Sequence, residues 1–108
     1  NFWQNNRFSF SDYMLSKMPI DLENVEKGNL DKEILRAGVI AELDAISLYE
    51  QLAEMTDDSV MKKVLLDVAK EEKEHVGEFQ TLLLEKDKEQ AKELKEGKEE
   101  VEEMRKGE

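Results

Sequence analysis

Residues 61–82 read MKKVLLDVAKEEKEHVGEFQTL and contain a heptad stripe with a charged centre. Alternating steps of four and three residues select the face that a helix buries against a partner. Two consecutive positions of that face are Glu72 and His75, the only histidine of the chain. Burying a carboxylate and an imidazole is unfavourable unless something pairs with them. The full stripe is Met61, Leu65, Val68, Glu72, His75, Phe79 and Leu82.

This pattern predicts a bound cation. A glutamate one helical turn before a histidine places an oxygen and a nitrogen ligand side by side, as in the Glu-x-x-His unit of di-iron helical bundles. A second inward carboxylate is predicted at Glu42, because its helical neighbours are apolar, small or aromatic. These neighbours are Leu35, Gly38, Val39, Ala45, Ile46 and Tyr49.

One chain therefore offers half of a di-metal ligand set. A carboxylate-bridged site in a four-helix bundle uses two lone glutamates and two Glu-x-x-His motifs, whereas this chain has Glu42 and the Glu72–His75 pair. We expect two copies to meet, with two metal ions on or near the axis that relates them.

Composition favours a small all-α protein. Among 108 residues, 40% are charged and 39% hydrophobic, with one proline and no cysteine. Such a chain favours long amphipathic helices, and so small a core favours oligomerisation. The net charge of −11 argues against nucleic acid and anionic membranes as partners. The absence of cysteine excludes thiolate metal sites and disulfides within the chain.

Start and stop signals divide the chain into three parts. We predict an aromatic-rich N-terminal arm over residues 1–29, a helical hairpin over 30–86 and a C-terminal helix or tail over 87–108. The first helix is expected from about Leu30 to Met55, capped by Asn29 or Asp31. The second, capped by Thr56 or Asp57, is expected to run to about Leu84. Because the connection is short, the two helices should be antiparallel.

The third part is predicted from a capping signal. Asp87 and Gln90 have capping-box spacing, which starts a third helix. A thin apolar seam runs along it through Leu94, Gly97, Val101 and Met104. The N-terminal arm either packs on its own or a neighbouring subunit, or docks on a larger partner.

Simpler interpretations of the charged residues stay open. Glu72 and His75 could be a structural pair in the core, without metal. Tyr49, two turns after Glu42, could be a core residue or could hydrogen-bond a ligand carboxylate. Asp44 faces away from Glu42 and is expected at the surface. Three further glutamates are expected on the solvated face: Glu71, Glu74 and Glu78.

Residues 30–104 resemble the encapsulated ferritins, which are ferritin-like proteins held inside encapsulin nanocompartments. The stretches that carry the resemblance are AELDAISLYEQLAE (41–54) and VAKEEKEHVGEF (68–79), with Glu42 thirty residues before Glu72. The resemblance implies a two-helix hairpin with a short C-terminal helix, which pairs into a ferritin-like four-helix bundle and an open ring, typically a decamer.

The same resemblance implies a ferroxidase. Glu42 and His75 would be terminal iron ligands, Glu72 a bridging ligand, and Tyr49 a residue next to the ligands. The protein would oxidise Fe(II) to Fe(III) at a di-iron centre between subunits, for storage within an encapsulin shell in the cytoplasm. An acidic pair that guides metal into such centres falls on Ala41 and Asp44, so only half of it is present.

Two rival functions stay open. One is a rubrerythrin-like peroxidase, against which the missing cysteines argue because its electron-donating iron centre needs thiolates. The other is a non-catalytic helical assembly module, in which the Glu and His residues are structural or bind zinc.

Overall fold

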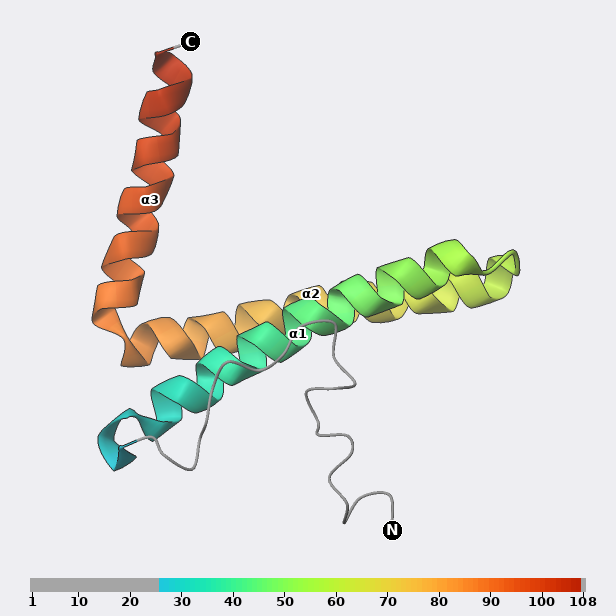
Figure 1. Ribbon diagram of the computed structural model, residues 1–108, viewed down its shortest axis with the longest axis horizontal. Coiled ribbons are helices and arrows are strands. Elements are labelled where there is room, and N and C mark those ends of the chain that lie inside the picture. Colours follow the sequence, from blue (N-terminus) through green and yellow to red (C-terminus); the bar gives the residue numbers. More distant parts are fainter. Residues whose placement is uncertain (1–25, 108) are drawn as a thin grey trace, which may run out of the picture.

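The computed structural model describes residues 26–107, and within them the chain forms a helical hairpin followed by a third helix that leaves it (Figure 1). A short 3-10 helix, η3 (Lys27–Asn29), leads into α1 (Leu30–Met55). Then follow α2 (Ser59–Lys86) and α3 (Lys88–Lys106). The predicted all-α hairpin with a C-terminal helix is confirmed. Most of the predicted N-terminal arm, residues 1–25, lies outside the described residues.

The turn between α1 and α2 is stabilised by side chains that replace missing helical hydrogen bonds. The Asp58 carboxylate accepts hydrogen bonds from the N–H groups of Val60 (2.9 Å) and Met61 (3.0 Å). The Thr56 hydroxyl oxygen accepts one from the Asp58 N–H at 3.1 Å. The helix cap is therefore Asp58, and the prediction of Thr56 or Asp57 was wrong. Thr56 is extended and stabilises the turn before the helix instead.

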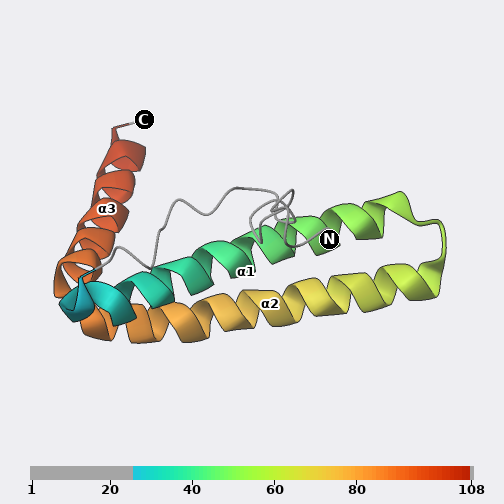
Figure 2. The same ribbon diagram turned by 60° about the horizontal axis from the view of Figure 1, so that its bottom comes forward.

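The contact between α1 and α2 is narrow and combines small with large apolar side chains. The buried apolar residues of the described part are Leu35, Ala53, Ala69 and Leu83. At Gly38 an added Cβ would lie 3.1 Å from the Phe79 ring, so the backbone of α1 runs directly over that ring. Figure 2 shows the two helices side by side along their length. A core this small leaves many apolar side chains exposed.

The corner between α2 and α3 is held by Asp87. Its carboxylate accepts the Gln90 N–H at 3.0 Å, which caps α3 as predicted. It also lies 2.8 Å from Arg36 Nη2 on α1, and Arg36 in turn binds Glu33 at 2.9 Å. The hydrogen bond from Gln90 is the main cause that lowers the pKa of Asp87, and the positive charges of Lys32 and Arg36 add to it. Asp87 thus ties the start of α3 to α1.

Beyond that corner, α3 projects away from the hairpin (Figures 1 and 2). It contains no buried residue. Its predicted seam is open to solvent, with Leu94 46%, Val101 46% and Met104 69% exposed. Among the described residues, no helix is both long and apolar enough to cross a membrane.

Candidate metal centre

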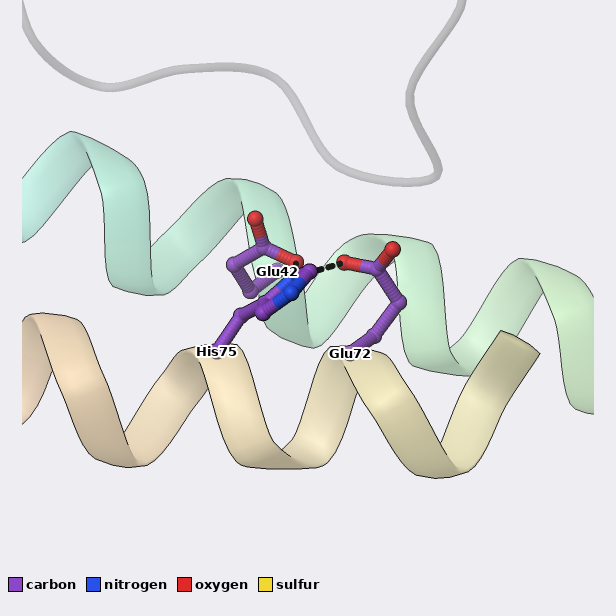
Figure 3. Close-up of side chains that lie close together, drawn as sticks. All are labelled: Glu42, Glu72 and His75. Carbon is purple, nitrogen blue, oxygen red and sulfur yellow. Dashed lines mark hydrogen bonds and ion pairs between the residues drawn. The ribbon is translucent and has the colours of Figure 1, made fainter. Parts of the chain in front are cut away.

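Three predicted ligands meet in the middle of the hairpin, as Figure 3 shows. Glu42 comes from α1, and Glu72 and His75 come from α2. One ligand atom from each residue lies within 4.8 Å of the other two. His75 Nδ1 is 3.4 Å from Glu72 Oε2 and 3.6 Å from Glu42 Oε2. Donors held at about 2.0–2.2 Å from one metal ion lie roughly 3–4 Å apart, so the spacing fits a shared cation.

The helical register explains why these three side chains meet. Residues three apart lie on one face of a helix, so Glu72 and His75 project together from α2. Because α1 runs antiparallel to α2, Glu42 near the middle of α1 lies opposite that pair. The pairing of Glu42 with a motif thirty residues later was predicted from sequence, and the structure brings these residues together.

The electrostatics of the cluster favour a cation. The side chains of Glu42 and Glu72 are each 19% exposed, which places two carboxylates in a partly dry contact. Glu42 Oε2 is fully buried and accepts no hydrogen bond from the residues that the structure describes. A buried carboxylate oxygen with an unfilled lone pair is unfavourable, and a metal ion would satisfy it. The donor set of two carboxylates and one imidazole suits iron, manganese or zinc.

The cluster is open on one side. His75 is 44% exposed, and along the same stripe Met61 is 53% and Leu82 48% exposed. The hairpin alone therefore leaves Met61 and Leu82 open, and burial of the whole stripe stays a prediction for the assembled protein. The reason is geometric, because α1 packs closest against the side of α2 that contains Ala69 and Leu83, which lies next to the stripe. Three donors next to an open apolar face leave room for groups from a second molecule.

Other predicted residues lie nearby with different outcomes. Tyr49 is half-buried on the Glu42 side of α1, and its hydroxyl makes no hydrogen bond with a described residue. Glu71, Glu74 and Glu78 are exposed, as predicted. Asp44 is only 9% exposed, so its prediction as a surface residue was wrong. A two-residue offset from Glu42 gives the direction of a side chain, but not what packs on that side of the helix.

Known proteins share the sequence and the fold of this chain. The model of the EncFtn-like family matches residues 18–98. The chain belongs to the EncFtn-like family. The solved structure of an encapsulated ferritin domain from Pyrococcus furiosus matches with a TM-score of 0.70 and 54% identity, over 82% of this chain and 93% of that one. The resemblance read from residues 41–54 and 68–79 is thereby confirmed.

Two curated relatives are longer than this chain. A ferritin-like–encapsulin shell fusion protein from Pyrococcus furiosus is 62% identical over 72 residues, which are 67% of this chain and 21% of the relative. The encapsulin nanocompartment cargo protein EncC from Myxococcus xanthus is 42% identical over 62 residues, 57% of this chain and 48% of the relative. The matched part thus spans about a fifth of one relative and half of the other.

No sequence pattern indicated the role of Arg36, which positions the corner between α2 and α3. Arg36 joins α1 to the α2–α3 corner through Asp87, which lies 51 residues away. A single arginine in a chain rich in charge gives no local signal of such a pairing.

Proposed function

We propose that this protein is a ferroxidase, in which two hairpins join their open faces and hold two iron ions between them. The observation that carries the proposal is the cluster of Glu42, Glu72 and His75 around an unsatisfied buried oxygen. Family membership supports ferritin-like chemistry for these residues. A second copy would supply the remaining donors of a carboxylate-bridged site.

In this proposal Fe(II) is the substrate. The carboxylates of Glu42 and Glu72 would bring negative charge to the metal. Negative charge stabilises Fe(III) more than Fe(II), so these ligands favour oxidation. His75 contributes a neutral nitrogen through Nδ1, the ring atom that faces both carboxylates. Each Fe(II) gives up one electron, and a dioxygen molecule takes the pair together with two protons to become hydrogen peroxide. Peroxide could serve as the oxidant in the same way, with water as the product.

We further propose that the reaction takes place inside an encapsulin shell. One relative is named as a fusion with such a shell and another as its cargo. Fe(III) released from open centres would then be stored as mineral in the surrounding compartment. Co-expression with an encapsulin shell protein tests this, because the chain should purify with intact shells. Intact shells that purify without the co-expressed chain would count against this location.

The activity is tested by mixing the protein with Fe(II) in air and following Fe(III) absorbance. Glu42→Gln and His75→Ala should lower the initial rate by at least tenfold while helix content stays unchanged. Glu74→Gln is the matched control, because Glu74 is exposed on α2 next to His75 but outside the cluster. If both cluster variants oxidise iron as fast as the control, the residues are structural and the proposal is wrong.

The rival functions give different results in the same assay. A rubrerythrin-like peroxidase would consume peroxide only when supplied with an electron donor, and would show little turnover of Fe(II) in air. A structural or zinc-binding module would bind metal without oxidising it.

A further inference from the structure

Asp44 is buried on the side of α1 that faces away from α2. It lies nine residues from Leu35 and nine from Ala53, the two buried apolar residues of α1. Nine residues make roughly two and a half helical turns, so Asp44 points roughly 180° away from both. Because Leu35 and Ala53 mark the contact with α2, the hairpin by itself would leave Asp44 in solvent. Its side of α1 is nevertheless covered, since Asp44 is only 9% exposed.

The cover extends over only part of this side of the helix. We call the side the outer face and define it by Asp44 and its neighbours at three, four and seven residues. The members before Asp44 are half-buried, and they are Ala37, Ile40 and Ala41. The members after it are exposed, and they are Ser47, Leu48 and Gln51. Whatever covers the outer face therefore lies over residues 37–44 and ends before residue 47.

The described helices do not supply this cover. Within residues 26–107, α1 contacts no helix other than α2 and η3. The η3 helix ends at Asn29, which is fifteen residues or about 22 Å from Asp44 along the helix axis. The α3 helix projects away from the hairpin (Figures 1 and 2). Because the burial belongs to a single chain, the source that remains is the segment before residue 26.

That segment has the apolar side chains that such a contact requires. Five of the seven aromatic residues of the chain lie within residues 2–20, which we call the aromatic arm. Aromatic rings bury a large area each, and the outer face offers Ile40 and two alanines to pack against. The aromatic residues of the arm are Phe2, Trp3, Phe8, Phe10 and Tyr13.

The charge of the arm also matches the outer face. A carboxylate as buried as that of Asp44 is unfavourable unless a donor or a cation lies beside it. The aromatic arm carries two cations, Arg7 and Lys17, and one acid, Asp12, in a chain whose net charge is −11. The arm can therefore place a positive charge beside the buried carboxylate.

The arm is long enough to reach the covered residues of its own chain. Asp44 lies about 21 Å beyond Leu30 along α1. An extended chain spans about 3.3 Å per residue, so about seven residues cover that distance. Counted back from Glu26, all arm residues up to about residue 19 can reach the level of Asp44.

We propose that the aromatic arm folds back over the outer face of α1 in the same chain. Its rings would pack over Ala37, Ile40 and Ala41, and one of its cations would lie at Asp44. The arm would add a third layer to a hairpin whose own core is small. Asp44 points roughly 160° away from Glu42, so this contact does not use the metal ligands.

The first test measures access to the outer face. The chain has no cysteine, so Ala37→Cys introduces a single thiol there. This thiol should react with a maleimide at least tenfold more slowly in the full-length chain than after deletion of residues 1–20. Gln51→Cys is the control, because Gln51 is exposed on the same face and its rate should not change. Circular dichroism checks that both chains keep their helices, and equal rates for Ala37→Cys with and without the arm would overturn the proposal.

Dilution separates a contact within one chain from a contact between copies. The slow reaction of Ala37→Cys should persist when the full-length protein is diluted about a hundredfold, because the arm belongs to the same molecule. A reaction that becomes faster on dilution would show that a second copy covers the face, and would overturn the proposal.

The second test identifies the covering segment in the full-length chain. Ile40→p-benzoylphenylalanine should form light-induced cross-links to residues 2–20, which tandem mass spectrometry can map. In a mixture of heavy-isotope and unlabelled chains, each cross-linked pair of peptides should carry a single isotope. Lys63→p-benzoylphenylalanine is the control, because Lys63 is exposed on α2 and should give no cross-link to the arm. Cross-links from position 40 to another segment, or to another copy, would overturn the proposal.

Discussion

At the scale of single residues, the environment of Glu42 combines two unfavourable features. Its Oε2 atom is buried without a hydrogen bond from the described residues, and Glu72 brings a second carboxylate to the same cluster. The histidine that faces both carboxylates does so at 3.4 Å and 3.6 Å, at or beyond the long end of hydrogen-bond geometry. Such an arrangement stabilises a bound ion more than it stabilises the empty hairpin.

We therefore expect Glu42→Gln to separate metal binding from stability. Without metal, the variant should be as stable as the wild-type chain or more stable, by about 1 kcal/mol, because a poorly solvated charge is removed. With metal, the order should reverse, because the wild-type chain gains binding energy that the variant lacks. Thermal unfolding followed by circular dichroism, with chelator and with added Fe(II), measures both. A variant that is strongly destabilised in chelator would mean that Glu42 has a structural partner.

Tyr49 lies two helical turns after Glu42 on the same side of α1 and is half-buried. If its hydroxyl orients a ligand carboxylate in the assembled centre, Tyr49→Phe should keep iron binding and slow oxidation by up to about 10–100-fold. Titration of bound iron and initial oxidation rates provide the two measurements. Leu48→Met, a change at an exposed neighbour, is the control. Equal rates in Tyr49→Phe and the wild-type chain would restrict the tyrosine to packing.

At the scale of helices, Gly38 sets how closely α1 approaches α2. An added Cβ would lie 3.1–3.2 Å from three atoms of the Phe79 ring, whereas nothing lies within 4 Å of a Cβ added at Gly77. Both glycines are inside long helices, so the intrinsic gain from alanine is the same at each. The difference in stability between the two alanine variants therefore measures the effect of packing against Phe79.

We expect Gly77→Ala to stabilise the protein by about 0.5–1 kcal/mol. Gly38→Ala should be less stable than Gly77→Ala by about 1–3 kcal/mol, because the new methyl group forces the ring or the helix to move. Urea unfolding of both variants gives the difference. Equal gains in stability in the two variants would show that the Phe79 ring moves aside without an energetic cost.

The corner between α2 and α3 should depend on pH. The pKa of Asp87 is lowered by the hydrogen bond from the Gln90 N–H and by nearby positive charges. A lowered pKa in the folded state means that the unfolded chain binds more protons as pH falls. The stabilisation is thus present above the ordinary carboxyl pKa of about 4 and is lost as pH falls through the lowered value.

Asp87→Ala should therefore be less stable than the wild-type chain at neutral pH, and the gap should close in acid. Measuring unfolding of both chains between about pH 7 and pH 3 tests this window. Asp57→Ala is the control, because Asp57 is exposed in the turn at the opposite end of the hairpin and caps no helix. A gap that stays constant down to the lowest pH would exclude the charge of Asp87 as its cause.

At the scale of the whole molecule, the described hairpin buries little and leaves apolar residues open on more than one side. Exposed apolar residues include Met61, Val64 and Leu82, which lie on the same side of α2 as His75, and also Leu43 and Leu66. Apolar surface distributed in this way favours association, since a small core gives limited stability to one chain alone. A contact between copies around the proposed metal centre would cover part of this surface.

Metal should strengthen the contact between copies. Because ligands from two chains converge on the ions, Fe(II) should shift the population toward larger species, and the iron bound should approach about one ion per chain. Native mass spectrometry under anaerobic conditions, with iron and with chelator, reads both quantities. A monomer that binds two iron ions tightly would contradict the shared centre. His75→Ala, which should assemble equally with or without iron, provides the control.

Much of this protein is determined by local sequence. The bounds of α1 follow from periodicity, since Asn29 makes no capping hydrogen bond with its side chain, and the start of α3 follows from the cap at Asp87; both signals act within a few residues. The meeting of Glu42, Glu72 and His75 also follows, because a short turn forces the two helices to be antiparallel and their faces to coincide. Helical spacing carries this information without any knowledge of the rest of the chain.

Contacts between distant residues were decided only by the tertiary structure. Neither the burial of Asp44 nor the approach of Gly38 to Phe79 has a local signature. The direction of α3 depends on Arg36 meeting Asp87 from another helix. Which apolar residues stay exposed depends in turn on that direction and on the narrow contact between α1 and α2. Periodicity gives the face of a helix, but only packing determines what covers that face.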